Sequence, residues 1–156
     1  MSELFANYKE IILTLHILGA VVWIGGMIAM RFAAHFSFAK LEPHIRLERS
    51  SEALRNLFII VAPFVAILLI TALIMAAAMG LHHGELSGIA FAKEGIWSAM
   101  TLNLIIMAIR RHKAQKLLDE GEYSKAKPIL TIIANYQVPA NILLGIVAIY
   151  LGVNLE

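Results

Sequence analysis

Long apolar stretches separated by short polar and charged segments are the main pattern of this chain. The stretches that carry few or no charges predict four helices, at about residues 11–34, 56–80, 90–112 and 128–153. Each is close to the roughly 20 residues that a helix needs to cross a bilayer. Pro63 and Pro139 fall inside the second and fourth stretches, where proline kinks a membrane helix. The pattern therefore predicts an all-α integral membrane protein.

The connections between the four stretches are short, so helices that are neighbours in sequence are expected to pack antiparallel. This arrangement is a four-helix antiparallel bundle that forms a single membrane domain, residues 1–156. Residues 43–56 and 110–118 favour helix and are expected to extend the second and third helices, with residues 119–122 as a turn.

The basic residues are distributed unequally between the loops. Eleven of the 13 Lys and Arg flank the first loop or fill the third, and the other two are Lys9 and Lys93. The positive-inside rule then predicts that these two loops are cytoplasmic and that both termini lie on the outer side. We expect a multi-pass protein of a bacterial-type inner (cytoplasmic) membrane, with the first apolar stretch retained because it is too long for a signal-peptide core.

Composition narrows the function further. The chain is 60% hydrophobic and 15% charged, whereas soluble proteins average roughly 25% charged, so the lipid bilayer is its expected surrounding. The net charge of +2 is small and the basic residues lie in loops, which argues against nucleic-acid binding. The absence of cysteine excludes disulfides, thiolate metal sites and iron–sulfur clusters. No P-loop, dinucleotide fingerprint or nucleophile–base pair is present, so a hydrolase or nucleotide enzyme is not expected.

The first apolar stretch contains one histidine, His16. It lies on the order of 9 Å inside Glu10 by helix rise, and an ionisable side chain at that depth marks a functional site. In a helix, the face that carries His16 also carries Gly19, Ala20, Trp23, Gly26, Met27 and Met30. Small residues let a neighbouring helix or a flat cofactor approach closely. His16 is a candidate ligand of haem iron or copper, or a hydrogen-bonding partner of a neighbouring helix.

A second candidate group lies at the end of the second helix. Met75 and Met79 are one turn apart, and His82 and His83 follow at once. With His16 at similar depth, thioether and imidazole together suit copper, especially Cu(I). Methionine also fills cores without any chemistry, so copper is the alternative to haem.

The opposite edge of the bundle carries polar candidates. Arg31 is about 22 Å deeper than His16 and either orients the helix or binds a carboxylate. In the third and fourth helices, Asn103, Asn135, Gln137 and Asn141 either form hydrogen bonds between helices or line a pocket near Pro139. If a tetrapyrrole or quinone is bound, Arg31 and the fourth-helix residues are the expected anchors, with Asn135 at the depth of Arg31.

The segment His16-x-x-Gly-x-x-x-Trp23-Ile-Gly-Gly26 resembles the first-helix signature of a superfamily of small membrane proteins. The superfamily includes the copper-resistance CopD domain and the HemJ-type protoporphyrinogen oxidases. The resemblance extends to Arg31, His35, Lys93 and Asn135-x-x-x-Pro139. The spacing from Trp23 to the basic residue and to His35 departs from the HemJ pattern by one or two residues.

The two branches imply different functions. The HemJ resemblance implies a b-type haem held by His16 and an oxidoreductase that removes electrons from a tetrapyrrole. The cofactor-binding residues are then His16, Trp23, Arg31, Asn135 and Asn141. The CopD resemblance implies periplasmic copper handling or import, with His16, Met75, Met79, His82 and His83 as ligands. A structural membrane subunit is the third alternative.

His16 and His35 are nineteen residues apart, which is roughly 100° out of phase on a regular α-helix. A two-haem cytochrome needs its two histidines on one face, so one haem on the outer side is expected. The second axial ligand is open between His82, His83, Met75, Met79 and none, and so are the substrate, the electron acceptor and a homo-oligomeric state.

Overall fold

In the computed structural model, residues 2–80 and 87–154 are described, and nearly all of them are helical. The elements in chain order are α1 (Ser2–Ile28), the π-helix η1 (Ala29–Ala34), α2 (His35–Phe38), α3 (Pro43–Met79), α4 (Ser87–Asp119), α5 (Tyr123–Ile132), the π-helix η2 (Ile133–Gln137) and α6 (Val138–Val153). Because α1, η1 and α2 are continuous, as are α5, η2 and α6, the eight elements form four rods. All four rods are long and apolar enough to cross a membrane, so the all-α prediction is confirmed and the rods are compatible with the predicted membrane spans.

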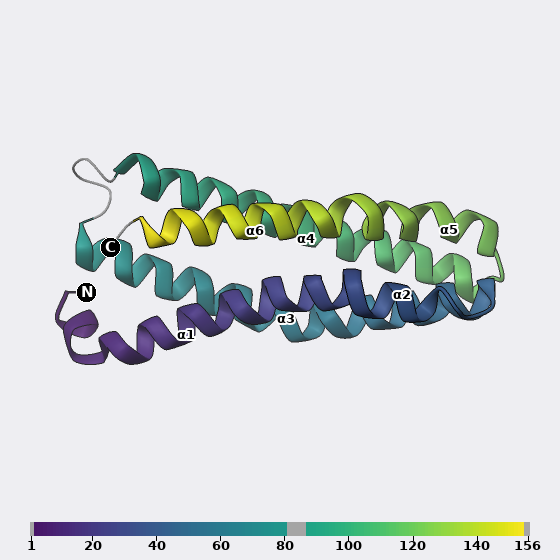
Figure 1. Cartoon of the computed structure of the whole chain (residues 1–156), viewed down its shortest axis with the longest axis horizontal. Coiled ribbons are helices and arrows are strands. Elements are labelled where there is room, and N and C mark those ends of the chain that lie inside the picture. The colour runs from purple at the N-terminus through teal and green to yellow at the C-terminus, as the bar shows by residue number, and fades with distance from the viewer. Residues whose placement is uncertain (1, 81–86, 155–156) are drawn as a thin grey trace.

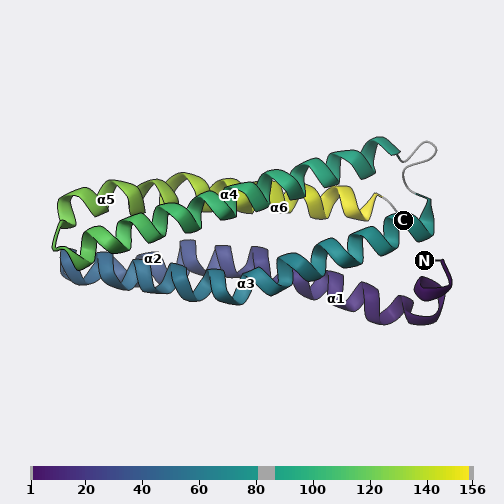
Figure 2. The ribbon, with the colours of Figure 1, turned by 180° about the vertical axis from the view of Figure 1, so that it is seen from behind.

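The four rods lie side by side and run up and down (Figure 1). The first rod packs against α3 and α6, and α4 packs against α3, α5 and α6. The view from behind shows the same order (Figure 2). The start of α1 and the end of α6 lie at one end, here called the terminal end. The opposite end carries α2, α5 and the two loops that the basic residues flank, and is called the basic end.

The rods are longer than a bilayer is thick. With 37 and 33 residues, α3 and α4 extend about 50 Å, against roughly 30 Å of hydrocarbon. The predicted extensions over residues 43–56 and 110–118 are confirmed, since both lie within these helices. The turn at the basic end passes through Gly121, whose φ of 76° is in the left-handed region that favours glycine.

Both π segments carry the backbone hydrogen bond that defines them. The His35 N–H donates to the Met30 carbonyl, and the Val138 N–H donates to the Ile133 carbonyl, five residues back in each case. Pro139 is the second residue after η2. Because proline has no N–H to donate and its ring clashes with the carbonyl four residues back, the wide turn accommodates it without a break.

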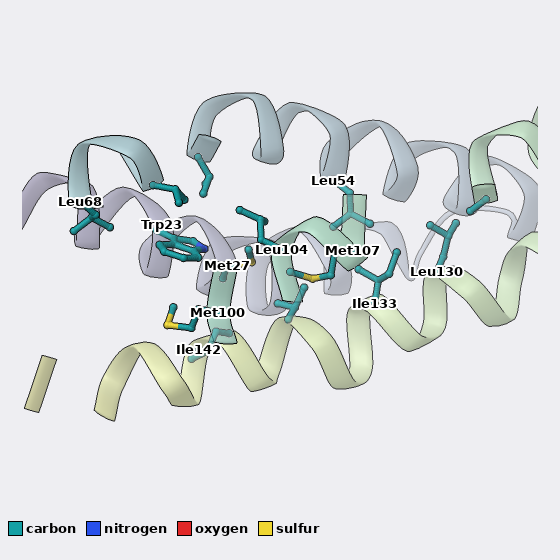
Figure 3. Packing of buried hydrophobic residues seen from close by; sticks show 14 of the residues in the cluster. Trp23, Met27, Leu54, Leu68, Met100, Leu104, Met107, Leu130, Ile133 and Ile142 are labelled. Atoms are coloured by element: carbon teal, nitrogen blue, oxygen red, sulfur yellow. The ribbon is translucent and has the colours of Figure 1, made fainter. Parts of the chain in front are cut away.

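The core extends along the bundle axis from Trp23 and Leu68 to Leu118 and Ala126 at the basic end, and Figure 3 shows part of it. Met27, Met107 and Ile133 are completely buried at its centre, one from each of three rods. Large apolar side chains also face outward on every rod; examples are Ile59, Leu102, Ile109 and Leu143. This apolar outer surface suits lipid rather than water.

Glycines set how closely the rods approach each other. A Cβ built on Gly19 would lie 2.7 Å from Leu68 Cγ and 3.3 Å from the Phe64 carbonyl oxygen. A Cβ on Gly145 would lie 2.7 Å from Ile24. Gly25, by contrast, has nothing within 4 Å of its added Cβ. The close contacts of α1 with α3 and α6 therefore depend on Gly19 and Gly145.

We expect Gly19→Ala to lower the free energy of unfolding by about 1–3 kcal/mol, because overpacking pushes α3 away from α1. The control is Gly25→Ala on the same helix, which should be neutral or slightly stabilising, because alanine favours helix. Thermal unfolding of both variants in one detergent measures the difference. Equal unfolding temperatures would show that the close approach at Gly19 contributes nothing.

Candidate functional site

His16 forms a hydrogen bond with α3. Its Nδ1 atom lies 2.8 Å from Thr71 Oγ1, and the Thr71 hydroxyl is 2.7 Å from the Ile67 carbonyl oxygen. The hydroxyl has one proton, which it donates to that carbonyl, so its oxygen accepts the proton of His16 Nδ1. This assigns the tautomer and leaves the lone pair of His16 Nε2 available to a ligand or a proton.

Lys93 provides a positive charge near His16. The two side chains are close enough to interact electrostatically, and both are half-buried. A Cβ built on Gly152 would lie 3.0 Å from Lys93 Nζ, so this α4 side chain lies against α6. The half of the bundle nearer the termini thus combines an imidazole with a cation.

Trp23 lies in the core rather than on an open face. It is 2% exposed, and its Nε1 has no hydrogen-bond partner within the described residues. On the same side of α1, Leu68 covers Gly19 and Leu57 covers Gly26. Of the two alternatives for the small residues of α1, helix packing is therefore what the structure shows.

The expected copper ligands are only partly described. Met75 is half-buried and follows Thr71 by one turn of α3, while Met79 is exposed. His82 and His83 lie outside the described residues. In the described ranges, no three His, Asp or Glu side chains form a group that could hold a metal ion. The five-residue copper set, which also includes His16, stays a prediction.

The polar residues of the fourth rod divide into two groups. Asn103 of α4 donates to Asn141 Oδ1 at 2.8 Å and to the Gln137 carbonyl at 2.9 Å. The Gln137 amide donates back to Asn103 Oδ1 at 2.8 Å. Gln137 and Asn141 are both buried. These three side chains link α4 to η2 and α6, so Asn141 serves helix packing here.

Asn135 instead faces a cavity at the basic end. This basic-end cavity has a volume of about 210 Å³ and is lined by residues of η1, α2, α3, α5, η2, α6 and the loop after α2. They are Met30, Arg31, His35, Ala39, Arg46, Leu47, Ser50, Leu54, Lys127, Leu130, Thr131, Ala134, Asn135 and Val138. Arg31 and Asn135 both line it, which confirms the prediction that they lie at one depth.

The π segment η1 changes the position of His35. A π turn holds one extra residue, so the side chains that follow it are rotated by roughly 100° relative to a continuous α-helix. The predicted offset of His35 from His16 assumed a regular α-helix, and that assumption is wrong. His35 lines the basic-end cavity. The expectation of a single haem therefore no longer has support from the His16–His35 offset and rests on His16 alone.

Sequence reasoning missed Thr71, Arg46 and Lys127 as site residues. Thr71 has a usable signal, because it is the one hydroxyl residue between Leu57 and Ala78. Arg46 and Lys127 look like ordinary loop cations in the sequence. Only the packing of the rods brings them beside Arg31.

Comparisons of the chain with protein family models, with curated proteins and with solved structures gave no match. Function is therefore inferred from the residues and their geometry. Two candidate sites follow from this geometry. One is His16 with Thr71, and the other is the basic-end cavity.

We expect Asn103→Leu to destabilise the bundle by about 1–3 kcal/mol, because the amides of Gln137 and Asn141 then stay buried without Asn103. Ser98→Ala is the control, since Ser98 is exposed on the same helix. Thermal unfolding in detergent measures both. Wild-type unfolding of Asn103→Leu would show that these hydrogen bonds contribute no net stability.

Proposed function

We propose that this protein binds one b-type haem through His16 and is redox-active. The hydrogen bond between His16 Nδ1 and Thr71 carries the proposal. A haem iron takes a neutral imidazole with one free nitrogen. A partner on the other ring nitrogen fixes the ring and raises its basicity as a ligand, and Thr71 is in that position.

Two further features fit a tetrapyrrole in this half of the bundle. Lys93 places a cation near His16, which favours an acidic group of the ligand. Trp23 Nε1 is a buried donor with no described partner, and a buried donor of this kind costs free energy until an acceptor satisfies it. At Gly19, however, Leu68 already fills the space between α1 and α3, so a haem has no room there.

The haem would supply one-electron transfer, and the chain would hold and orient it. The HemJ-type resemblance adds a tetrapyrrole as the electron donor and makes the protein an oxidoreductase, with a quinone as the kind of acceptor that a bilayer supplies. We place the terminal end on the outer side of a bacterial inner membrane. The support for this orientation is that eleven of 13 Lys and Arg lie in or beside the two loops at the basic end.

Copper is the second candidate, and one observation favours it. Met75 follows Thr71 by one turn of α3, so a thioether is on the side of α3 that holds His16. Imidazole and thioether are a ligand pair suited to Cu(I). A CopD-like copper function would use these two residues first.

We expect protein from haem-replete cells to show a Soret band, with α and β bands that sharpen on reduction. His16→Ala should abolish these bands, whereas His35→Ala, at the other end of the bundle, should keep them. Thr71→Val should weaken haem retention by about 10–100-fold, because it removes the partner that orients the imidazole. A colourless protein that stays unchanged after added haemin contradicts the proposal.

Metal analysis of the same preparations separates haem from copper. With haem as the cofactor, copper should stay far below one per chain in wild type and in Met75→Leu alike. Near-stoichiometric copper that is lost in both Met75→Leu and His16→Ala would establish the copper alternative. The absence of both haem and copper would favour a structural membrane subunit.

Single cysteines test the orientation, because the chain has none of its own. Glu120→Cys lies in the turn between α4 and α5, and Asn154→Cys follows α6. An impermeant maleimide on intact spheroplasts should label Asn154→Cys, and it should label Glu120→Cys only after lysis. The opposite labelling pattern would reverse the topology.

A further inference from the structure

Three cations meet in the basic-end cavity without acidic partners. Arg31, Arg46 and Lys127 all line it, and its described lining contains no Asp or Glu. Within the described ranges none of the three has an ion pair, and the Arg31 guanidinium carbon lies 6.0 Å from the centroid of the Phe32 ring. Like charges held together without counter-charges favour a bound anion.

Two other cations at the basic end have acidic partners. Arg49 pairs with Glu52 at 2.6 Å, and Lys125 pairs with Glu122 at 3.1 Å. Arg111 donates to the neutral groups Ser51 Oγ at 3.1 Å and Gln115 Oε1 at 2.9 Å. None of these three basic side chains lines the cavity.

The cavity has an apolar wall as well as a polar rim. Ser50, Thr131 and Asn135 add hydroxyl and amide groups beside the cations. The wall is formed by apolar side chains from η1, α3, α5 and α6: Met30, Leu47, Leu54, Leu130 and Val138. Beside it, Phe32 and Tyr136 are 60% and 70% exposed on the outside of the bundle. A ligand that matches this surface has an anionic head and an apolar body.

The cavity also lies at the depth of a lipid headgroup. Glu10 and Arg31 are the charged residues that bound the first span, and 21 residues of helix rise separate them by about 31 Å. That distance matches the roughly 30 Å of hydrocarbon in a bilayer. With Glu10 at one interface, Arg31 lies at the other, where the phosphates of that leaflet are.

Both π segments border this cavity. Met30 and Arg31 belong to η1, and Ala134 and Asn135 belong to η2. Segments of this kind are frequently found at functional sites, because they displace side chains from the regular helical positions. Here the two irregular turns lie on neighbouring rods and contribute to the same cavity.

We propose that the basic-end cavity binds the phosphate headgroup of an anionic phospholipid from the leaflet at the basic end. Arg31, Arg46 and Lys127 bind the phosphate, and the apolar wall contacts the start of the acyl chains. Basic pockets between membrane helices bind anionic headgroups in this way. The site is separate from His16, which lies about 22 Å away along the first rod.

Native mass spectrometry of the full chain in neutral detergent tests this site. The probes are dioleoyl phosphatidylglycerol and dioleoyl phosphatidylcholine, which share acyl chains and differ in net charge. Wild type should retain phosphatidylglycerol at least about ten-fold better than phosphatidylcholine. The double variant Arg31→Gln/Arg46→Gln should lose about thirty-fold in phosphatidylglycerol affinity, because each cation contributes about five-fold.

The matched control is Arg49→Gln/Lys113→Gln, which removes the same charge from the basic end but from residues that do not line the cavity. It should bind phosphatidylglycerol like wild type. Lys127→Gln serves as a second pocket variant should the double variant fail to fold. Arg31→Lys should retain binding, because phosphate accepts a point charge.

Three results would overturn the proposal. The first is equal retention of the two lipids by wild type. The second is an equal loss of binding in the pocket and control variants. The third is full displacement of phosphatidylglycerol by millimolar inorganic phosphate, which would show a free-phosphate site instead. Haem spectra of the same variants keep this outcome separate from the haem proposal, since His16 is unchanged in all of them.

Discussion

A hydrocarbon surrounding offers no water to hydrogen-bond a polar group, so each polar side chain within the spans must find its partner in the protein. His16 meets this requirement through Thr71, and Asn103 meets it through Gln137 and Asn141. These contacts join α1 to α3 and α4 to the last rod. Four buried side-chain atoms have no described hydrogen-bond partner and are exceptions to this rule: Trp23 Nε1, Trp97 Nε1, Thr101 Oγ1 and Gln137 Oε1.

Charge divides the bundle into two chemically different ends. Towards the termini, the His16 imidazole is bonded to Thr71 through Nδ1 and lies near one lysine, an arrangement that fits the proposed metal ligation through Nε2. At the basic end, three cations share a cavity with no acid in its lining, which suits an anion and not a metal ion. The two sites are separated by most of the bilayer thickness, so each would act on its own side of the membrane.

The sequence predicts the four rods well, because helix length, charge-free stretches and loop charges are local properties. It also predicts that Arg31 and Asn135 lie at one depth, since counting residues from the same interface along two rods gives depth directly. It does not predict that Thr71 holds His16, or that Gln137 and Asn141 turn to Asn103. Those pairings depend on how the rods are rotated against one another, and the sequence of each rod does not specify that rotation.

The π segments show where residue counting fails. A regular α-helix would rotate His35 by roughly 100° from His16, and the extra residue held by η1 offsets most of that rotation. On the fourth rod, η2 ends at Gln137, immediately before Val138 and Pro139, so the proline gives a local cause for one π turn. For η1 the segment Ala29–Ala34 contains neither proline nor glycine. The π turn there places Arg31 and His35 on the cavity that η2 also lines, so its tertiary surroundings, not its own sequence, account for it.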